Sequence, residues 1–338
     1  MKDLIQGLGQ EEAFEHISTV FDPWSALFTG WFFSIILQSA TIVAIFVITL
    51  IGADTISLNL GFYTFLGLFL GNSVTPIIAV LLLKYDKKAQ LRNAFKIGFS
   101  NIMYSFLIFS LALILELSIN LFTLCGKLLT SRIGDVYILK RIPTLVDALV
   151  SPLINLATLI PLHPLLYILL IIGVLLIAFR MFDGTIEQLL GGEKKAERII
   201  QENLKSRSKV FAFSLGLGFI LPSASLLVSL AVPLAARGVI KLKQAIPYII
   251  GTNLATFIDV VFASLANGLP GAIASSLMLV MMSSLGIVFL IPRLGISLIY
   301  RPTNLFCSLL PMKRRSVFLF LLSYTLVPVL CFFLIQLV

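Results

Sequence analysis

Residues 222–256 read PSASLLVSLAVPLAARGVIKLKQAIPYIIGTNLAT, and the fold is predicted first from this stretch. It contains two apolar segments, and small polar residues interrupt each of them, Ser223–Ser225 in the first and Thr252–Thr256 in the second. Unwound backbone at membrane depth is tolerated only where protein or a water-filled cavity surrounds it. The stretch therefore predicts membrane helices that break next to a site inside the bilayer.

Composition agrees with a membrane location for the whole chain. Of 338 residues, 59% are hydrophobic and 12% are charged, whereas a soluble domain has about 25% charged residues. Apolar runs of roughly 20 residues, enough to cross a bilayer, recur near 60–83, 97–124, 164–182, 244–267, 270–291 and 317–338, with a weaker run near 144–160. We predict an all-α polytopic protein that crosses the plasma membrane several times.

Charge and motifs exclude several other classes of protein. The net charge of +9 could indicate a nucleic-acid partner, but the Lys and Arg residues lie in short loops between apolar runs. Basic residues in such loops are topology signals, so no nucleic acid is expected. The sequence has no phosphate-binding Walker motif and no Gly-x-Ser-x-Gly nucleophile motif. We therefore expect no enzyme activity and no cofactor other than a coupling ion.

The motif at Ser223 has a counterpart in the first half of the chain. Gln38-Ser39-Ala40-Thr41 precedes Asn72-Ser73-Val74-Thr75, and Pro222-Ser223-Ala224-Ser225 precedes Asn253-Leu254-Ala255-Thr256. The apolar arms on either side of each first motif, 25–37 with 39–51 and 210–221 with 223–236, are too short to cross a bilayer separately. Each pair could form one continuous crossing, but the polar break in its middle favours a re-entrant helical hairpin.

Loop charge indicates that the two copies are inverted. The loop near residue 54 has no Lys or Arg and the following loop, 84–96, has five. In the second half the order is reversed, because loop 237–243 is basic and loop 267–270 carries no charge. Since basic loops stay in the cytoplasm, equivalent spans must run in opposite directions. The fold class predicted is two inverted-topology repeats, each with a re-entrant helical hairpin.

These boundaries divide the chain into three parts. Residues 1–22 form an N-terminal surface segment, residues 23–163 the first transmembrane repeat, and residues 164–338 the second, with a charged cytoplasmic linker at 183–209. The basic loop 125–143 falls outside the cell in this topology and does not fit it.

The Ser-Ala-(Ser/Thr) motifs predict an anion site. Each one begins the second arm of its pair, where free backbone N–H groups and the positive end of the helix dipole are found. Two such helix ends meeting from opposite sides bind an anion without a buried Lys or Arg. The hydroxyl donors expected around a small oxyanion are those of Ser39, Thr41, Ser223 and Ser225.

The later motifs predict a cation site. Neutral side-chain oxygens and freed backbone carbonyls suit sodium, and Pro76, which lacks an N–H, favours a break directly after Thr75. Asp259 is ionisable and lies in an apolar stretch, which makes it a candidate cation or proton ligand. The alternative is that these residues only hold helices together. The predicted sodium or hairpin-tip residues are Asn72, Ser73, Thr75, Thr252, Asn253, Thr256 and Asp259.

The quoted stretch, together with Gln38, Ser39, Asn72 and Thr75, resembles the type II sodium/phosphate cotransporter family. That family has Gln-Ser-Ser-Ser followed by Gly-x-Asn-x-Gly-Thr in each repeat. The resemblance implies sodium-coupled symport of inorganic phosphate by alternating access. It adds Gln38 to the substrate-binding residues and implies that Asn72, Thr75, Asn253 and Thr256 hold sodium or the hairpin tips.

The chain departs from the family pattern in its first motifs. Ala40 and Ala224 replace a serine in each copy, and Pro222 replaces the second glutamine. The span that precedes the first hairpin in the family is also missing. Three alternatives therefore stay open: another small anion, coupling to protons through Asp259, or a membrane binding or sensor protein that does not transport.

Overall fold

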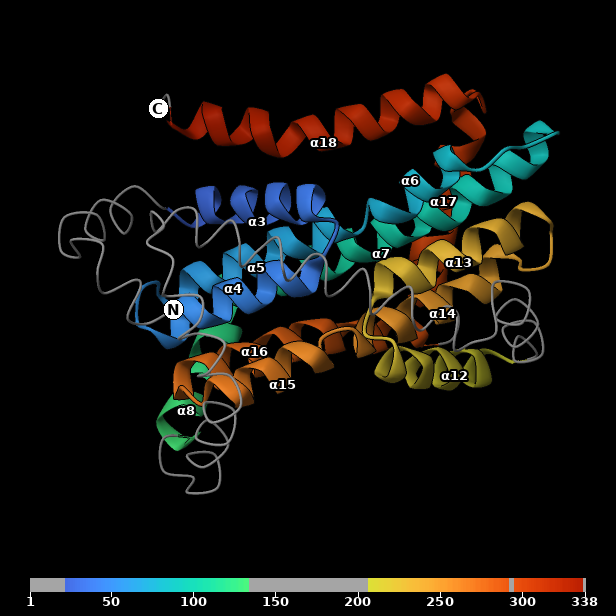
Figure 1. The fold of residues 1–338 in the computed structure, drawn as a ribbon. Coiled ribbons are helices and arrows are strands. Elements are labelled where there is room, and N and C mark those ends of the chain that lie inside the picture. The colour runs from blue at the N-terminus through green and yellow to red at the C-terminus, as the bar shows by residue number, and fades with distance from the viewer. Residues whose placement is uncertain (1–21, 134–205, 292–294, 337–338) are drawn as a thin grey trace, which may run out of the picture.

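The computed structural model describes residues 22–133, 206–291 and 295–336, and all regular structure in these ranges is helical (Figure 1). The described helices confirm an all-α protein. The segment 1–21, the apolar runs near 144–160 and 164–182, and the linker up to residue 205 lie outside the described residues.

Within the described residues, five helical segments are long and apolar enough to cross a bilayer, which agrees with a multi-pass membrane protein. They coincide with five of the predicted spans, but the second begins nine residues before position 97 and ends before position 124. Its early start is capped by Gln90, whose Oε1 accepts hydrogen bonds from the N–H groups of Asp86 and Lys87. It ends at Ile119 because Asn120 adopts a left-handed conformation with φ 49°. The five segments are Leu58–Leu82, Lys88–Ile119, Leu242–Asn267, Pro270–Leu290 and Arg314–Ile335.

The chain reverses direction at both predicted hairpin positions. Helix α3 (Pro23–Leu37) ends at Gln38, which has φ 52°, and α4 (Ala40–Gly52) follows. Helix α12 (Arg207–Ile220) is likewise followed by α13 (Ala224–Ala236). Both turns lie in the middle of the molecule, and the outer ends of the two helix pairs lie at opposite ends of it (Figure 1).

Two of the five long segments are broken where the later polar motifs occur. Helix α5 (Leu58–Asn72) gives way to α6 (Thr75–Leu82), and α14 (Leu242–Ala255) gives way to α15 (Ile258–Asn267). The first break follows from Pro76, which occupies the first turn of α6 and has no N–H to donate to the preceding turn.

Glycines allow α3 and α12 to pack closely on these broken segments. A Cβ on Gly67 of α5 would lie 1.8 Å from the Leu27 carbonyl oxygen of α3. A Cβ on Gly251 of α14 would lie 2.1 Å from Ser214 Oγ of α12. Small residues are typical of such contacts between membrane helices, because they let two backbones approach. The packing brings the turn after α3 next to the α5–α6 break, and the turn after α12 next to the α14–α15 break.

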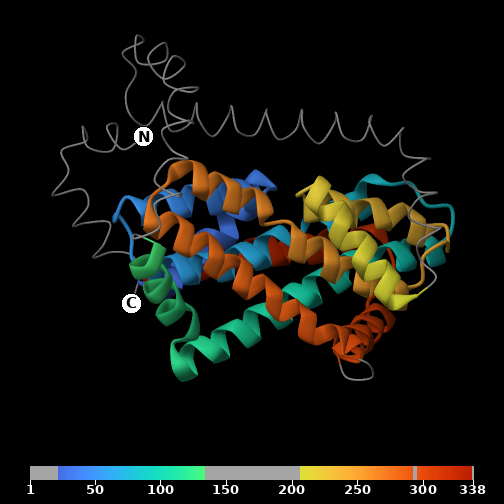
Figure 2. The same cartoon turned by 90° about the horizontal axis from the view of Figure 1, so that it is seen from below.

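The other helices enclose this arrangement. Helix α7 (Lys88–Ile119) runs the length of the molecule and packs against α5, α6, α13 and α14 (Figure 2). Helix α16 (Pro270–Ser284) packs against α4 and α8 (Leu121–Ile133) and continues as a 3₁₀ helix, η2 (Leu285–Leu290). Helix α17 (Gly295–Leu309) packs on α7, whereas α18 (Arg314–Gln336) packs on α3 and α6 and is largely exposed.

The basic loops gather at one end of the molecule. The connections 83–87, 237–241 and 310–313 lie together there, and the connections 53–57 and 268–269 lie at the opposite end (Figure 1). Arg314 of α18 donates hydrogen bonds at the basic end to the carbonyl oxygens of Leu81 and Leu83. These connections match the charge pattern of a bilayer-spanning protein. Helix α8, with Lys127 and Arg132, does not, because it lies at the end opposite the basic connections (Figure 1).

Candidate functional site

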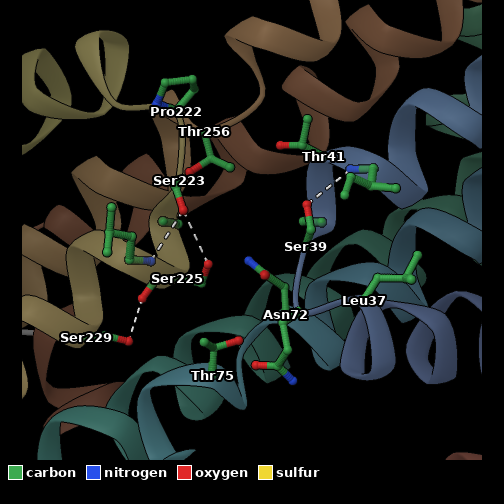
Figure 3. Close-up of a pocket in the computed structure, with 15 residues that line it drawn as sticks. Leu37, Ser39, Thr41, Asn72, Thr75, Pro222, Ser223, Ser225, Ser229 and Thr256 are labelled. Carbon is green, nitrogen blue, oxygen red and sulfur yellow. Dashed lines mark hydrogen bonds between the residues drawn. The ribbon is translucent and has the colours of Figure 1, made fainter. Parts of the chain in front are cut away.

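A cavity of about 250 Å³ lies where the two reversals and the two breaks meet (Figure 3). Its walls come from the ends of α3, α4, α5, α6, α13 and α14, so helix ends rather than helix sides form it. As far as the described residues line it, the cavity contains no Lys, Arg, His, Asp or Glu. The polar lining residues are Gln38, Ser39, Thr41, Asn72, Thr75, Ser223, Ser225, Ser229 and Thr256.

Serines cap the two helices that begin at the cavity. Ser39 Oγ accepts a hydrogen bond from the N–H of Ile42 at 3.3 Å, and Ser223 Oγ accepts one from Leu226 at 3.4 Å. Each cap satisfies one of the free N–H groups of the first turn and leaves its own hydroxyl proton available. The N-termini of α4 and α13 therefore present donors and partial positive charge to the cavity from both sides.

The second cap belongs to a short hydroxyl cluster on α13. Ser223 Oγ lies 3.4 Å from Ser225 Oγ, and Ser229 Oγ donates to the carbonyl oxygen of Ser225 at 2.6 Å. Ser229 lines the cavity but was not predicted from the sequence. It follows Ser225 by four residues and so lies on the same helix face, which is the signal that could have identified it.

The α5–α6 break supplies oxygen atoms that have no hydrogen-bond partner among the described residues. They are Oδ1 of Asn72, a residue 7% exposed, and Oγ1 of Thr75. A buried polar oxygen without a partner costs about 1–3 kcal/mol of stability. Such an atom is therefore expected where a bound ligand supplies the missing interaction. Enclosed neutral oxygens with open lone pairs suit a dehydrated cation. The corresponding Thr256 of the second half donates to the Thr252 carbonyl oxygen at 2.8 Å.

Three predicted residues lie outside the cavity lining and use their polar groups within the protein. Ser73 Oγ donates to the carbonyl oxygen of Leu70 at 2.6 Å. Thr252 Oγ1 lies 3.0 Å from two carbonyl oxygens of the preceding helical turn. Asn253 Nδ2 donates to Asn101 Oδ1 at 3.1 Å and to the Ile249 carbonyl oxygen at 2.8 Å. These three side chains therefore hold the walls of the cavity and do not face it.

Asp259 lies behind the cavity wall, in the first turn of α15. Its Oδ1 accepts a hydrogen bond from the N–H of Val260 at 2.7 Å. The Thr41 side chain interacts with the Asp259 carboxyl group, although Oδ2 is enclosed and has no hydrogen bond of standard geometry within the described ranges. Since Thr41 lines the cavity, it separates the cavity from a carboxyl group that could accept a cation or a proton.

Asn101 of α7 is a further buried polar residue that sequence reasoning missed. It is 2% exposed and hydrogen-bonds both the α5–α6 break and Asn253. The available signal was its amide side chain within the apolar run that begins at residue 97, since polar side chains inside membrane helices need partners.

A polar cavity between broken membrane helices is an arrangement that transporters use for their binding sites. The family model of the Na+/Pi-cotransporters matches residues 1–131 and 174–300, so the chain belongs to the Na+/Pi-cotransporter family. This match confirms the resemblance seen in the sequence. No curated protein and no solved structure matches the chain.

Proposed function

We propose that the protein is a sodium-coupled symporter of inorganic phosphate that works by alternating access in the plasma membrane. The observation that carries the proposal is the cavity between the N-termini of α4 and α13, which is lined by the first motifs of both halves of the sequence. Backbone N–H groups and the hydroxyls of Ser39, Thr41, Ser223 and Ser225 would donate to the phosphate oxygens, with Gln38 beside them.

The charge of the cavity supports cotransport with a cation. Phosphate is an anion at neutral pH, and burying an unpaired charge is very costly. Among the described residues the lining offers no basic side chain, and partial helix charges compensate only part of a full negative charge. A cation that enters with the phosphate would neutralise the remainder. The binding energetics would then couple phosphate to sodium.

Three groups of atoms are proposed to hold the sodium. The first is the pair of enclosed oxygens, Asn72 Oδ1 and Thr75 Oγ1. The second is the set of carbonyl groups freed at the helix breaks, which coordinate cations in transporters with discontinuous helices. The third is the Asp259 carboxyl group behind Thr41. In this scheme Ser73, Thr252, Asn253 and Thr256 hold the breaks in place.

Alternating access would follow from two inverted repeats. We propose that α3–α4 and α12–α13 are re-entrant hairpins that enter from opposite faces of the bilayer. Two observations support this arrangement (Figure 1). The outer ends of the two helix pairs lie at opposite ends of the molecule, and the basic loops 83–87 and 237–241 lie together at one end. Exchange of conformations between equivalent halves would open the cavity first to one face and then to the other.

Asp259 supports a second candidate, in which the coupling ion is a proton. A carboxyl oxygen that is enclosed without a partner in the described part of the chain could equally take up a proton. A proton-coupled transporter would take up phosphate under an inward proton gradient in the absence of sodium. It would lose that uptake when Asp259 is replaced by Asn.

Uptake of radiolabelled phosphate into proteoliposomes tests the proposal. Separate samples receive an inward gradient of sodium, of potassium or of protons, and sulfate serves as a competing anion. Ser39→Ala combined with Ser223→Ala removes the two caps at the cavity, and Ser110→Ala on exposed α7 surface is the matched control. Sodium-dependent uptake that the double variant loses and the control keeps would support the proposal. Binding of phosphate without uptake under any gradient would support a sensor instead.

A further inference from the structure

A chain of buried hydrogen bonds connects the two broken segments behind the cavity. Asn101 of α7 donates through Nδ2 to the carbonyl oxygen of Ser73, at 3.2 Å. Its Oδ1 accepts a hydrogen bond from Asn253 Nδ2 of α14, at 3.1 Å. The Asn101 amide group therefore donates a hydrogen bond to the α5–α6 break and accepts one from the segment that contains the α14–α15 break.

Both ends of this chain continue to neighbouring helices. Ser73 Oγ lies 3.3 Å from the hydroxyl of Tyr324 on α18. The carbonyl oxygen of Asn253 accepts a hydrogen bond from Ser283 Oγ of α16, at 3.1 Å. The side chains of Ser73, Asn101, Asn253 and Ser283 are each at most 6% exposed. The chain is therefore a defined set of bonds inside the protein.

The Ser73 carbonyl oxygen is available because of the break. In a continuous helix the N–H groups three or four residues later would compete for it, but Pro76 has no N–H. The N–H of Ile77 donates instead to the carbonyl oxygen of Val74 at 2.8 Å. Asn101 thus supplies the Ser73 carbonyl oxygen with the hydrogen bond that the Ile77 N–H would make in a continuous helix, and it fixes the backbone between Asn72 and Thr75.

We propose that Asn101 is a positioning residue that couples the two halves of the transporter. Through Ser73 it sets the positions of Asn72 and Thr75, the residues with open oxygens at the cavity. Through Asn253 it holds α14 three residues before Thr256, which lines the opposite wall. A shift of one break is transmitted to the other by way of this single side chain. The inference rests on the proposed function, because it assigns Asn101 a role in transport.

A purely structural role makes a different prediction. Hydrogen bonds between membrane helices often serve only to hold the helices together. Leucine has nearly the shape of asparagine but cannot form these bonds, and replacing both partners of a buried bond by apolar groups of similar shape can leave stability nearly unchanged. The pair Asn101→Leu and Asn253→Leu therefore separates stability from transport.

The experiment compares four proteins with the wild type: Asn101→Leu, Asn253→Leu, the double variant, and Ser100→Ala. Ser100 is buried on the same helix, and the bond that its hydroxyl donates goes to Ile97 within that helix. For each protein the apparent melting temperature is measured in detergent. Sodium-dependent phosphate uptake is measured in proteoliposomes at several sodium concentrations. These measurements give the maximal rate and the KM for sodium.

The proposal expects the two measurements to diverge in the double variant. Each single variant should melt at a lower temperature and show at least a tenfold lower maximal rate or a tenfold higher KM for sodium. The double variant should melt above Asn101→Leu, because the Asn253 amide no longer lacks its partner, and below the wild type, because the Ser73 carbonyl oxygen still lacks its donor. Its uptake should stay at least tenfold impaired. Ser100→Ala should remain within twofold of the wild type. If a leucine variant does not fold, Asn101→Thr takes its place and must show the same tenfold loss.

Two results would overturn the inference alone, while the proposed function stands. One is uptake within twofold of the wild type in all variants, and the other is recovery of both stability and uptake in the double variant. No phosphate uptake by the wild type under any gradient would overturn the proposed function, and the inference with it.

Discussion

The two later motifs, Asn72-x-x-Thr75 and Asn253-x-x-Thr256, have the same sequence pattern but use their polar groups differently. In the first half Asn72 and Thr75 keep enclosed oxygens without partners in the described part of the structure. In the second half Asn253 bonds Asn101 and the Ile249 carbonyl oxygen, and Thr256 bonds Thr252. Equivalent residues have therefore diverged, so that the first break is open to a ligand and the second is closed by internal bonds.

A second asymmetry concerns charge. Asp259 follows Asn253 by six residues, and the residue six positions after Asn72 is Ile78. At this equivalent position the second half has a carboxyl group and the first half has an apolar side chain. In the proposed function, the first half would contribute neutral ligands and the second half rigidity and a charge. Each of the following predictions tests one part of that division.

The largest contrast is expected between Asn72→Leu and Asn253→Leu. Asn72→Leu should reduce sodium-dependent uptake at least thirtyfold but change the stability by less than about 1 kcal/mol, because it removes an oxygen without a partner. Asn253→Leu should cost about 1–3 kcal/mol of stability, because it orphans Asn101 Oδ1. Uptake assays and unfolding in detergent check the pair. Equal loss of stability in both variants would contradict the division.

Asp259→Asn should have the next largest effect. If the carboxylate is a cation ligand, its neutral isostere should raise the KM for sodium about tenfold, which corresponds to about 1.4 kcal/mol. The KM for phosphate at saturating sodium should change much less. Ile78→Asn at the equivalent position of the first half is the matched comparison. An unchanged sodium dependence in Asp259→Asn would remove this residue from the site.

A smaller contrast is expected between Thr75→Val and Thr256→Val. Valine has the shape of threonine but lacks the hydroxyl, so Thr75→Val should lower uptake several-fold without loss of stability. Thr256→Val breaks the bond to the Thr252 carbonyl oxygen and should cost about 1 kcal/mol. Its uptake should stay within about threefold of the wild type. The reverse ranking of the two variants in uptake would show that the second break is the ligand site.

The smallest change is expected from adding hydroxyls to the first motifs. Ala40→Ser and Ala224→Ser each restore the residue type of the family pattern in the cavity lining. An added donor should lower the KM for phosphate a few-fold, if the new hydroxyl reaches the anion. Titration of uptake with phosphate measures this. A rise in KM in both variants would mean that the cavity is filled by something other than an oxyanion.

Much of this arrangement could be predicted from the sequence. The apolar runs identified the five described spans, Pro76 predicted the first break, and eight of the twelve predicted site residues line one cavity, although they come from both halves of the chain. These residues can be picked out from the sequence because a small polar residue inside an apolar run is costly unless it has a ligand or a partner. That they bind a ligand stays a prediction.

The sequence could not distinguish a ligand from a structural bond. Asn72 and Asn253 occupy the same place in the motif, but Asn253 has a partner in Asn101, which lies across from it on another helix. That contact joins residues 152 positions apart, which no local pattern encodes. Asn101 was missed for the same reason, because its hydrogen bonds join it to two partners in other helices.

In the proposed function, phosphate binds tightly in the cavity when sodium neutralises its charge. Calorimetric titration of the purified protein with phosphate, in sodium chloride and in potassium chloride of equal concentration, tests this most directly. We predict binding in sodium that is at least tenfold weaker in potassium and that is lost when Ser39→Ala and Ser223→Ala are combined. Equal affinity in the two salts, or binding that survives the double substitution, would contradict the account.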